Sequence, residues 1–93
     1  MQPETRIGEN AIVNTNASVD HECLVGDHVH IAPGGVIAGG VRIGNGSFVG
    51  ANATIIDGVS VGSNSTVGAG AVVIDDVPSG CTVVGVPATP VGS

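Results

Sequence analysis

The chain has 93 residues, of which 42% are hydrophobic, yet it contains one Phe, no Trp, no Tyr and sixteen Gly. Because aromatic rings normally supply much of a compact core, this composition argues against a conventional globule. Two basic residues against eight acidic ones give a formal net charge of -6, which excludes general nucleic-acid binding.

The composition and the sequence pattern also limit which classes of protein are possible. No apolar run approaches the roughly eighteen residues that a membrane helix needs, and the N-terminal residues lack the pattern of a signal peptide. Cys23 and Cys81 lie far apart without CxxC spacing, so we expect reduced thiols rather than a zinc ribbon or a disulfide framework. We predict a soluble, cytoplasmic, single-domain protein that is small enough to benefit from oligomerisation.

A branched aliphatic residue recurs every six residues without an insertion. The twelve positions are Ile7, Val13, Val19, Val25, Ile31, Ile37, Ile43, Val49, Ile55, Val61, Val67 and Val73. Four residues after each comes a mostly small residue, and three residues after each comes Gly or Asn, except at Glu22, His28 and Asp76. Gly and Asn tolerate a positive φ, so each unit reads as a short strand followed by a corner.

Three such corners close a triangle, so one coil takes 18 residues and the repeat over residues 7–78 makes four coils. The sequence therefore predicts an all-β fold, a single-stranded, left-handed parallel β-helix with four triangular coils. Residues 1–6 are a lead-in too short to cap the first coil, and residues 79–93 are expected to leave the prism and close its last coil. Low-complexity sequence and another kind of β-solenoid are the alternative interpretations.

Residue n stacks on residue n+18 in such a helix, which places His21 beside Gly39 and His30 beside Phe48. Imidazole suits a general base near neutral pH, and the neighbouring carboxylate of Glu22 is a candidate to fix its tautomer and raise its basicity. The alternative interpretation of His21 is an exposed corner histidine with an incidental acidic neighbour.

Three segments narrow the choice of family. They are Asn14-Thr15, the run Val19-Asp20-His21-Glu22-Cys23 with a second histidine nine residues after His21, and the closing Val84-Gly85-Val86-Pro87-Ala88. The chain resembles the hexapeptide-repeat acyltransferases, and among them the C-terminal domain of the sugar O- and N-acetyltransferases of the NeuD and PglD type. The resemblance implies direct transfer of acetyl from acetyl-CoA to an amine or hydroxyl of a nucleotide-linked sugar, and no metal is expected.

The same resemblance implies roles for individual residues. His21 is the general base, Glu22 raises its basicity, and the backbone N–H of Gly39 stabilises the oxyanion. His30 contacts acetyl-CoA. The backbones of Ala51 and Ala69 line the pantetheine groove.

The spacing of the two histidines bears on the assembly. His21 and His30 are nine residues apart, half of one coil, so they lie on different sides of one prism. If both serve one site, a neighbouring subunit must supply one of them. We predict a homotrimer with its sites between subunits, which the resemblance also implies.

Several features depart from a complete family member. We expect this chain to lack the family's N-terminal nucleotide-sugar-binding domain, because its sequence shows no Gly-rich βαβ unit. Thr89 stands where the family often has a basic residue, and Arg42 is the only base within the prism. A non-catalytic trimeric β-helix module that lacks acceptor recognition is therefore the alternative function. His28 and His30 form a His-x-His pair, which is a metal site only if a neighbour adds a ligand.

Overall fold

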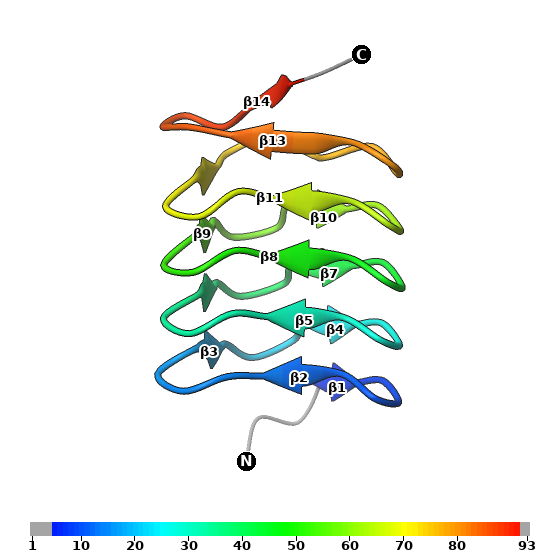
Figure 1. Cartoon of the computed structure of the whole chain (residues 1–93). Helices are drawn as coiled ribbons and strands as arrows, with labels where there is room; N and C mark the ends of the chain where they lie inside the picture. Colours follow the sequence, from blue (N-terminus) through cyan, green and yellow to red (C-terminus); the bar gives the residue numbers. More distant parts are fainter. Residues whose placement is uncertain (1–4, 92–93) are drawn as a thin grey trace.

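In this computed structural model, which describes residues 5–91, every regular element is a β-strand (Figure 1). The first twelve strands have two residues each and the last two have three. In chain order they are β1 (Arg6–Ile7), β2 (Ile12–Val13), β3 (Ser18–Val19), β4 (Leu24–Val25), β5 (His30–Ile31), β6 (Val36–Ile37), β7 (Arg42–Ile43), β8 (Phe48–Val49), β9 (Thr54–Ile55), β10 (Ser60–Val61), β11 (Thr66–Val67), β12 (Val72–Val73), β13 (Thr82–Val84) and β14 (Thr89–Val91).

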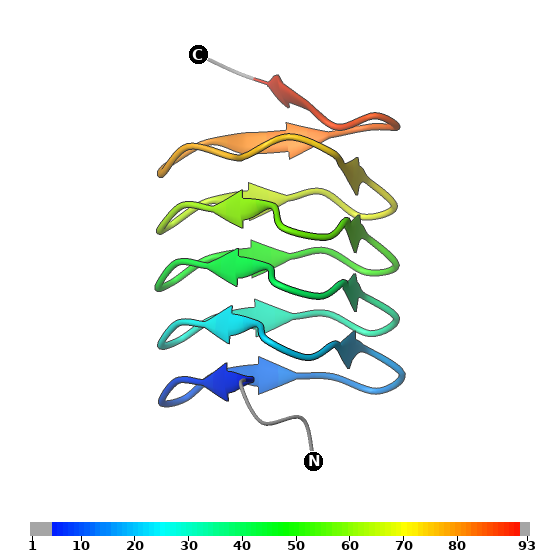
Figure 2. The ribbon, with the colours of Figure 1, turned by 180° about the vertical axis from the view of Figure 1, so that it is seen from behind.

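The strands form three sheets, one on each side of a triangular prism. Sheet A has the order β1-β4-β7-β10, sheet B has β14-β13-β11-β8-β5-β2, and sheet C has β12-β9-β6-β3. Strands of successive coils pair in parallel with an offset of eighteen residues, as between Arg6 and Leu24. Figures 1 and 2 show the stacked coils from opposite sides. The predicted left-handed parallel β-helix is confirmed.

Three corners join the sheets, and each is named here after the sheets that it connects. The A/B corner comprises residues 8–11, 26–29, 44–47 and 62–65; the B/C corner comprises 14–17, 32–35, 50–53 and 68–71; the C/A corner comprises 20–23, 38–41, 56–59 and 74–77. Backbone hydrogen bonds tie each corner to the next coil, as where the N–H of Gly40 donates to the carbonyl of His21 at 3.1 Å.

The corners require left-handed backbone at the position that the sequence fills mostly with Gly or Asn. Glu22 and His28, two of the three exceptions, adopt the same conformation, with φ of 61° and 60°. A side chain other than that of Gly costs roughly 1–2 kcal/mol in this region, and somewhat less for Asn. The third exception, Asp76, does not have a positive φ among the described residues, and there the last coil changes its spacing.

The interior is filled by the repeating aliphatic positions and the small residues between them. Ile31, Val49 and Ile55 are completely buried, as are the small partners Cys23 and Ala53. The narrow triangular interior explains why the core contains no aromatic ring.

Two buried serines continue this interior. Ser47 and Ser65 satisfy their hydroxyl groups by donating to the carbonyls of Gly62 at 2.6 Å and Pro78 at 2.7 Å. The core therefore accepts a small polar residue wherever a corner carbonyl is within reach.

The C-terminal end differs in detail from the expected boundary at residue 78. Val77 bridges Val61, and β13 pairs in parallel with β11 through Thr66 and Thr82, both with an offset of sixteen residues. The stack thus continues to Val84 through a coil that is shorter by two residues. β14 then returns antiparallel along β13 as the closing segment (Figure 1).

The first coil has the exposed edge expected from the sequence. The inward-facing residues Ile7 and Val13 are 49% and 38% exposed, because no described strand lies on the outer side of β1 or β2. Residues 1–4 of the predicted lead-in and residues 92–93 of the closing segment lie outside the described residues. Between residues 5 and 91, no helix is long and apolar enough to cross a membrane.

Close stacking at the A/B corner leaves no room for a side chain at Gly44. A Cβ added there would lie 2.6 Å from the backbone nitrogen of Ser63 and 2.7 Å from the carbonyl carbon of Gly62. These are backbone atoms that cannot swing away, so Gly44→Ala should lower the free energy of unfolding by about 1–3 kcal/mol in urea denaturation. Gly39→Ala is the control, since its Cβ would make ordinary contacts at 3.6 Å or more. Equal stability of the two variants would contradict the stacking.

Candidate functional site

The C/A corner holds His21 in a defined orientation through its neighbour Asp20. Oδ1 of Asp20 accepts hydrogen bonds from the backbone N–H of His21 at 2.7 Å and from Nδ1 of its ring at 2.8 Å. Both side chains are about half exposed, at 56% and 51%. A carboxylate can only accept, so Nδ1 carries a proton, and in the neutral ring Nε2 is then the nitrogen with the free lone pair.

The carboxylate in contact with His21 is therefore Asp20, whereas the sequence pattern pointed to Glu22. No hydrogen bond or ion pair joins Glu22 to His21 in the described structure. Asp20 stands immediately before the corner, where an Asp side chain commonly accepts from the following backbone N–H groups. That turn preference was the signal in the sequence that could have identified Asp20.

The hydrogen bonds lower the pKa of the Asp20 carboxyl below its usual 3.8, chiefly through the backbone N–H of His21 and then through its ring. A carboxyl whose pKa is lowered by folding stabilises the folded state above its unfolded-state pKa. That contribution is lost as the pH falls through the folded-state pKa, so the pair is intact at neutral pH.

Gly39 lies beside the ring of His21, one coil further along the prism. A Cβ on Gly39 would be 3.7 Å from both Cε1 and Nε2 of His21, so the glycine leaves the space beside Nε2 open. The N–H of Gly39 makes no hydrogen bond with any described residue. The stacking that the sequence predicts for these two residues is confirmed.

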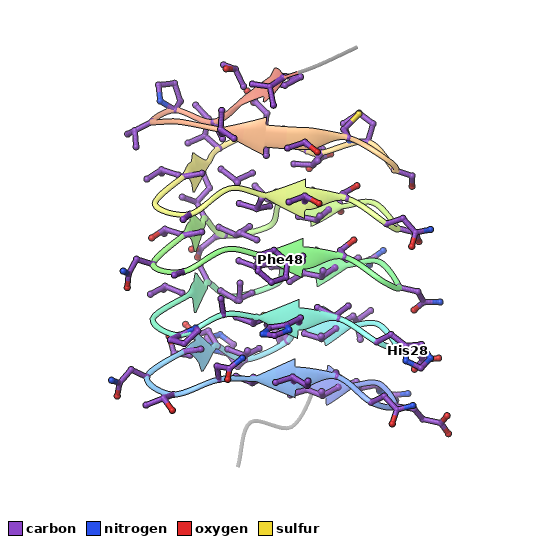
Figure 3. All side chains as sticks on the ribbon, viewed as in Figure 1. His28 and Phe48 are labelled. Carbon is purple, nitrogen blue, oxygen red and sulfur yellow. The ribbon has the colours of Figure 1, made fainter. Side chains whose placement is uncertain are left out.

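His30 is held on the outer face of sheet B by residues of the coils on either side. The side-chain amide nitrogen of Asn14 lies 2.7 Å from Nε2 of His30 and donates also to the carbonyl of Ile31 at 3.2 Å. An amide nitrogen can only donate, so Nε2 of His30 accepts and the ring proton is on Nδ1. Phe48, labelled on β8 in Figure 3, contacts the His30 ring edge-on, with the two ring centroids 5.1 Å apart. Asn14 had no assigned role in the sequence analysis.

A strip of small residues runs along the B/C corner next to His30. Ala51 and Ala69 stack in register, since the N–H of Gly70 donates to the carbonyl of Ala51 at 2.8 Å. Gly50 beside them has no room for a Cβ, which would lie 2.5 Å from the backbone nitrogen of Ala69. The corner therefore presents backbone with few protruding side chains, along which an extended ligand chain could lie.

The two histidines do not meet within one chain. His21 lies at the C/A corner between β3 and β4, whereas His30 lies in β5 of sheet B. His28 is exposed at the A/B corner, and no group of three His, Cys, Asp or Glu side chains in residues 5–91 is arranged to hold a metal ion.

Cys23, two residues after His21, belongs to the core. It is fully buried, its Sγ donates to the carbonyl of Ala38 at 3.0 Å, and burial raises the pKa of its thiol. A buried thiol with a raised pKa is a poor nucleophile. The imidazole of His21, and not this thiol, is therefore the candidate reactive group at this corner.

The hydrogen bonds of Asp20 predict how it titrates. In wild type, NMR titration should give an Asp20 carboxyl pKa below 3.8. In His21→Ala, the backbone donor remains and the ring donor is lost, so this pKa should rise but stay below the usual value. An Asp20 pKa that is identical in the two proteins would show that the ring is not bonded to the carboxylate.

Two families of repeat sequences match the chain. The family described as bacterial transferase hexapeptide (six repeats) matches residues 4–39, and the hexapeptide repeat of succinyl-transferase matches residues 40–74. The matches adjoin and together span residues 4–74, which is most of the regular coils.

Solved structures show the same arrangement with substantial sequence identity. A mutant of perosamine N-acetyltransferase from Caulobacter crescentus, in complex with CoA and GDP-perosamine, is 43% identical with a TM-score of 0.94, over 96% of this chain and 42% of that one. The acetyltransferase domain of PglB from Neisseria gonorrhoeae, in complex with acetyl coenzyme A, is 39% identical with a TM-score of 0.89, over 96% and 52%. Serine acetyltransferase from Neisseria gonorrhoeae is 36% identical with a TM-score of 0.91, over 97% and 39%.

A curated relative that matches half of the chain is also an acyltransferase. The acyl-carrier-protein-dependent UDP-N-acetylglucosamine O-acyltransferase of Campylobacter concisus is 37% identical over 46 residues, 50% of this chain and 18% of that protein. The chain thus spans about half or less of the length of the relatives that it matches. Its repeat, its fold and these similarities agree, and the chain belongs to the hexapeptide-repeat family of transferases.

Proposed function

We propose that the chain is an acetyltransferase domain that transfers acetyl from acetyl-CoA to an amine or hydroxyl group of a nucleotide-linked sugar. The observation that carries the proposal is the Asp20–His21 pair with its open Nε2 beside Gly39. The similar perosamine enzyme binds CoA and GDP-perosamine, and the PglB domain binds acetyl coenzyme A, which supports this choice of donor and acceptor.

The proposed chemistry is a direct attack in a ternary complex. Nε2 of His21 accepts the proton of the acceptor amine or hydroxyl as the acceptor atom bonds to the thioester carbonyl carbon. The carbonyl oxygen becomes an oxyanion, to which the N–H of Gly39 donates. Collapse of this intermediate breaks the carbon–sulfur bond, and the CoA sulfur leaves as a thiol with the proton from His21. Asp20 holds the Nδ1 proton and stabilises the transient imidazolium.

The donor site lies along sheet B and the B/C corner. Asn14 keeps the His30 proton on Nδ1, so His30 presents a fixed hydrogen-bond donor to acetyl-CoA. The small residues Ala51 and Ala69 leave room for the pantetheine chain. Arg6 and Arg42 are the only basic residues of the chain, and Thr89 adds no cation for the CoA phosphates, so we expect modest affinity for the donor.

The separation of His21 and His30 supports a site between subunits of a homotrimer. The C/A corner of one subunit must approach sheet B of the next, and a threefold axis produces three such equivalent contacts.

Cys23 and Cys81 are free thiols, which supports the proposed cytoplasmic location.

The first experiment follows the thiol released from acetyl-CoA with a panel of amino-sugar nucleotides, together with serine as an alternative acceptor. His21→Ala should lower turnover about 10²–10⁴-fold, because the proton acceptor is lost. It should keep the rise in melting temperature that acetyl-CoA gives to wild type. Turnover unchanged in His21→Ala would overturn the catalytic role. No thermal shift in wild type would instead favour a non-catalytic β-helix module.

The second experiment tests whether neighbouring subunits share one site. His21→Ala and His30→Ala chains should each have low turnover alone. After they are mixed, denatured and refolded together, about one quarter of the sites should combine an intact His21 with an intact His30 from the neighbour. Turnover should therefore recover to about a quarter of wild type. No recovery in trimers that have demonstrably mixed would contradict the shared site.

A further inference from the structure

The proposed function constrains which faces of the prism meet in the trimer, and this inference rests on it. His21 lies at the C/A corner, and the small-residue strip beside His30 lies at the B/C corner. These two corners approach each other in neighbouring subunits when sheet A of one subunit packs against sheet B of the next. If sheet C packed against sheet B instead, the B/C corner would lie at the threefold axis, far from the His21 of any subunit.

The surfaces of sheets A and B fit this pairing. The outer face of sheet A carries a hollow of about 370 Å³, lined among others by Arg6, Leu24 and Arg42. Sheet B presents Ile12 and Phe48, which are 49% and 40% exposed. A ridge of exposed apolar side chains on one sheet and a hollow with an exposed leucine on the other can bury each other between two copies of the chain.

With sheets A and B facing neighbours, the A/B corner is the one nearest the axis. The outermost residues of this corner are all polar or Gly: Glu9, Asn10, Asp27, His28, Asn45, Gly46, Ser63 and Asn64. Among them His28 is exposed and points outward from the corner that joins β4 and β5 (Figure 3). It occupies the left-handed position that Asn10, Gly46 and Asn64 fill in the other coils.

We propose that the three His28 side chains of the trimer converge at the axis and bind one divalent transition-metal ion, such as Zn²⁺. Imidazole is a preferred ligand of Zn²⁺, Ni²⁺ and Cu²⁺, and three histidines with one water complete a tetrahedral zinc site. Each subunit contributes one ligand, so the site forms only when three chains assemble. The ion links the three subunits at a point away from the proposed acetyl-transfer site.

The binding test uses metal-free wild type and His28→Asn, with Zn²⁺ as the probe. Wild type should bind one Zn²⁺ for every three chains in equilibrium dialysis, and its melting temperature should rise by roughly 3 °C or more. His28→Asn should lose both effects. Asn suits the left-handed position, as at Asn10 and Asn64, so the variant should fold and keep its thiol release within about twofold. Zinc retained in His28→Asn, or one ion for every chain, would overturn the proposal.

A cross-linking test addresses the geometry independently of the metal. In a Cys81→Ser background, His28→Cys and Asn52→Cys place a thiol on the A/B and B/C corners at nearly equal φ, 60° and 59°. A short bismaleimide should join subunits of the His28→Cys protein and not those of the Asn52→Cys protein. The reverse result would mean that the B/C corner lies at the axis. A trimer that releases thiol but neither cross-links at position 28 nor binds zinc refutes this inference and leaves the proposed function intact.

Discussion

The parallel backbone ladder between coils is the constraint on which the rest of the molecule depends. Each coil donates to the next at regular positions, as where the N–H of Gly8 donates to the carbonyl of Val25 at 2.8 Å. The ladder fixes an offset of eighteen residues, so a side chain's neighbour on the next coil is determined by arithmetic. His21 lies beside Gly39 and His30 beside Phe48 for this reason alone. A shift of the register by one residue would separate both pairs and turn the aliphatic residues out of the core.

The same regularity explains where chemistry can reside in this fold. Aliphatic residues fill the interior, so chemistry is left to the outward-facing side chains, at the corners as for His21 or on a sheet as for His30. Glu22 and His28 occupy corner positions where Gly or Asn would be more stable. Residues held in a costly conformation often mark functional sites, where local stability is exchanged for function. His28 serves the proposed trimer axis, and the corner of Glu22 also carries the Asp20–His21 pair.

Much of this structure could be predicted from the sequence because one rule repeats over most of the chain. The period of six gave the fold, the coil length, the buried positions and the separation of His21 from His30. Side-chain direction at a corner is not contained in that period, so the choice between Asp20 and Glu22 as the partner of His21 required the structure. The same holds for Asn14, whose contact with His30 crosses between coils at a spacing of sixteen. The sixteen-residue step that carries the stack to β13 also breaks the repeat, and no periodic rule predicts it.

The central claim is that the ladder places two halves of one acetyl-transfer site on different sides of each prism, to be joined by neighbouring chains. A crystal structure of the protein with bound CoA tests this most directly. The account predicts the CoA sulfur between the Nε2 of His21 from one chain and His30 of the next, with the pantetheine along Ala51 and Ala69. CoA bound within a single chain, or with its sulfur remote from every His21, would contradict it.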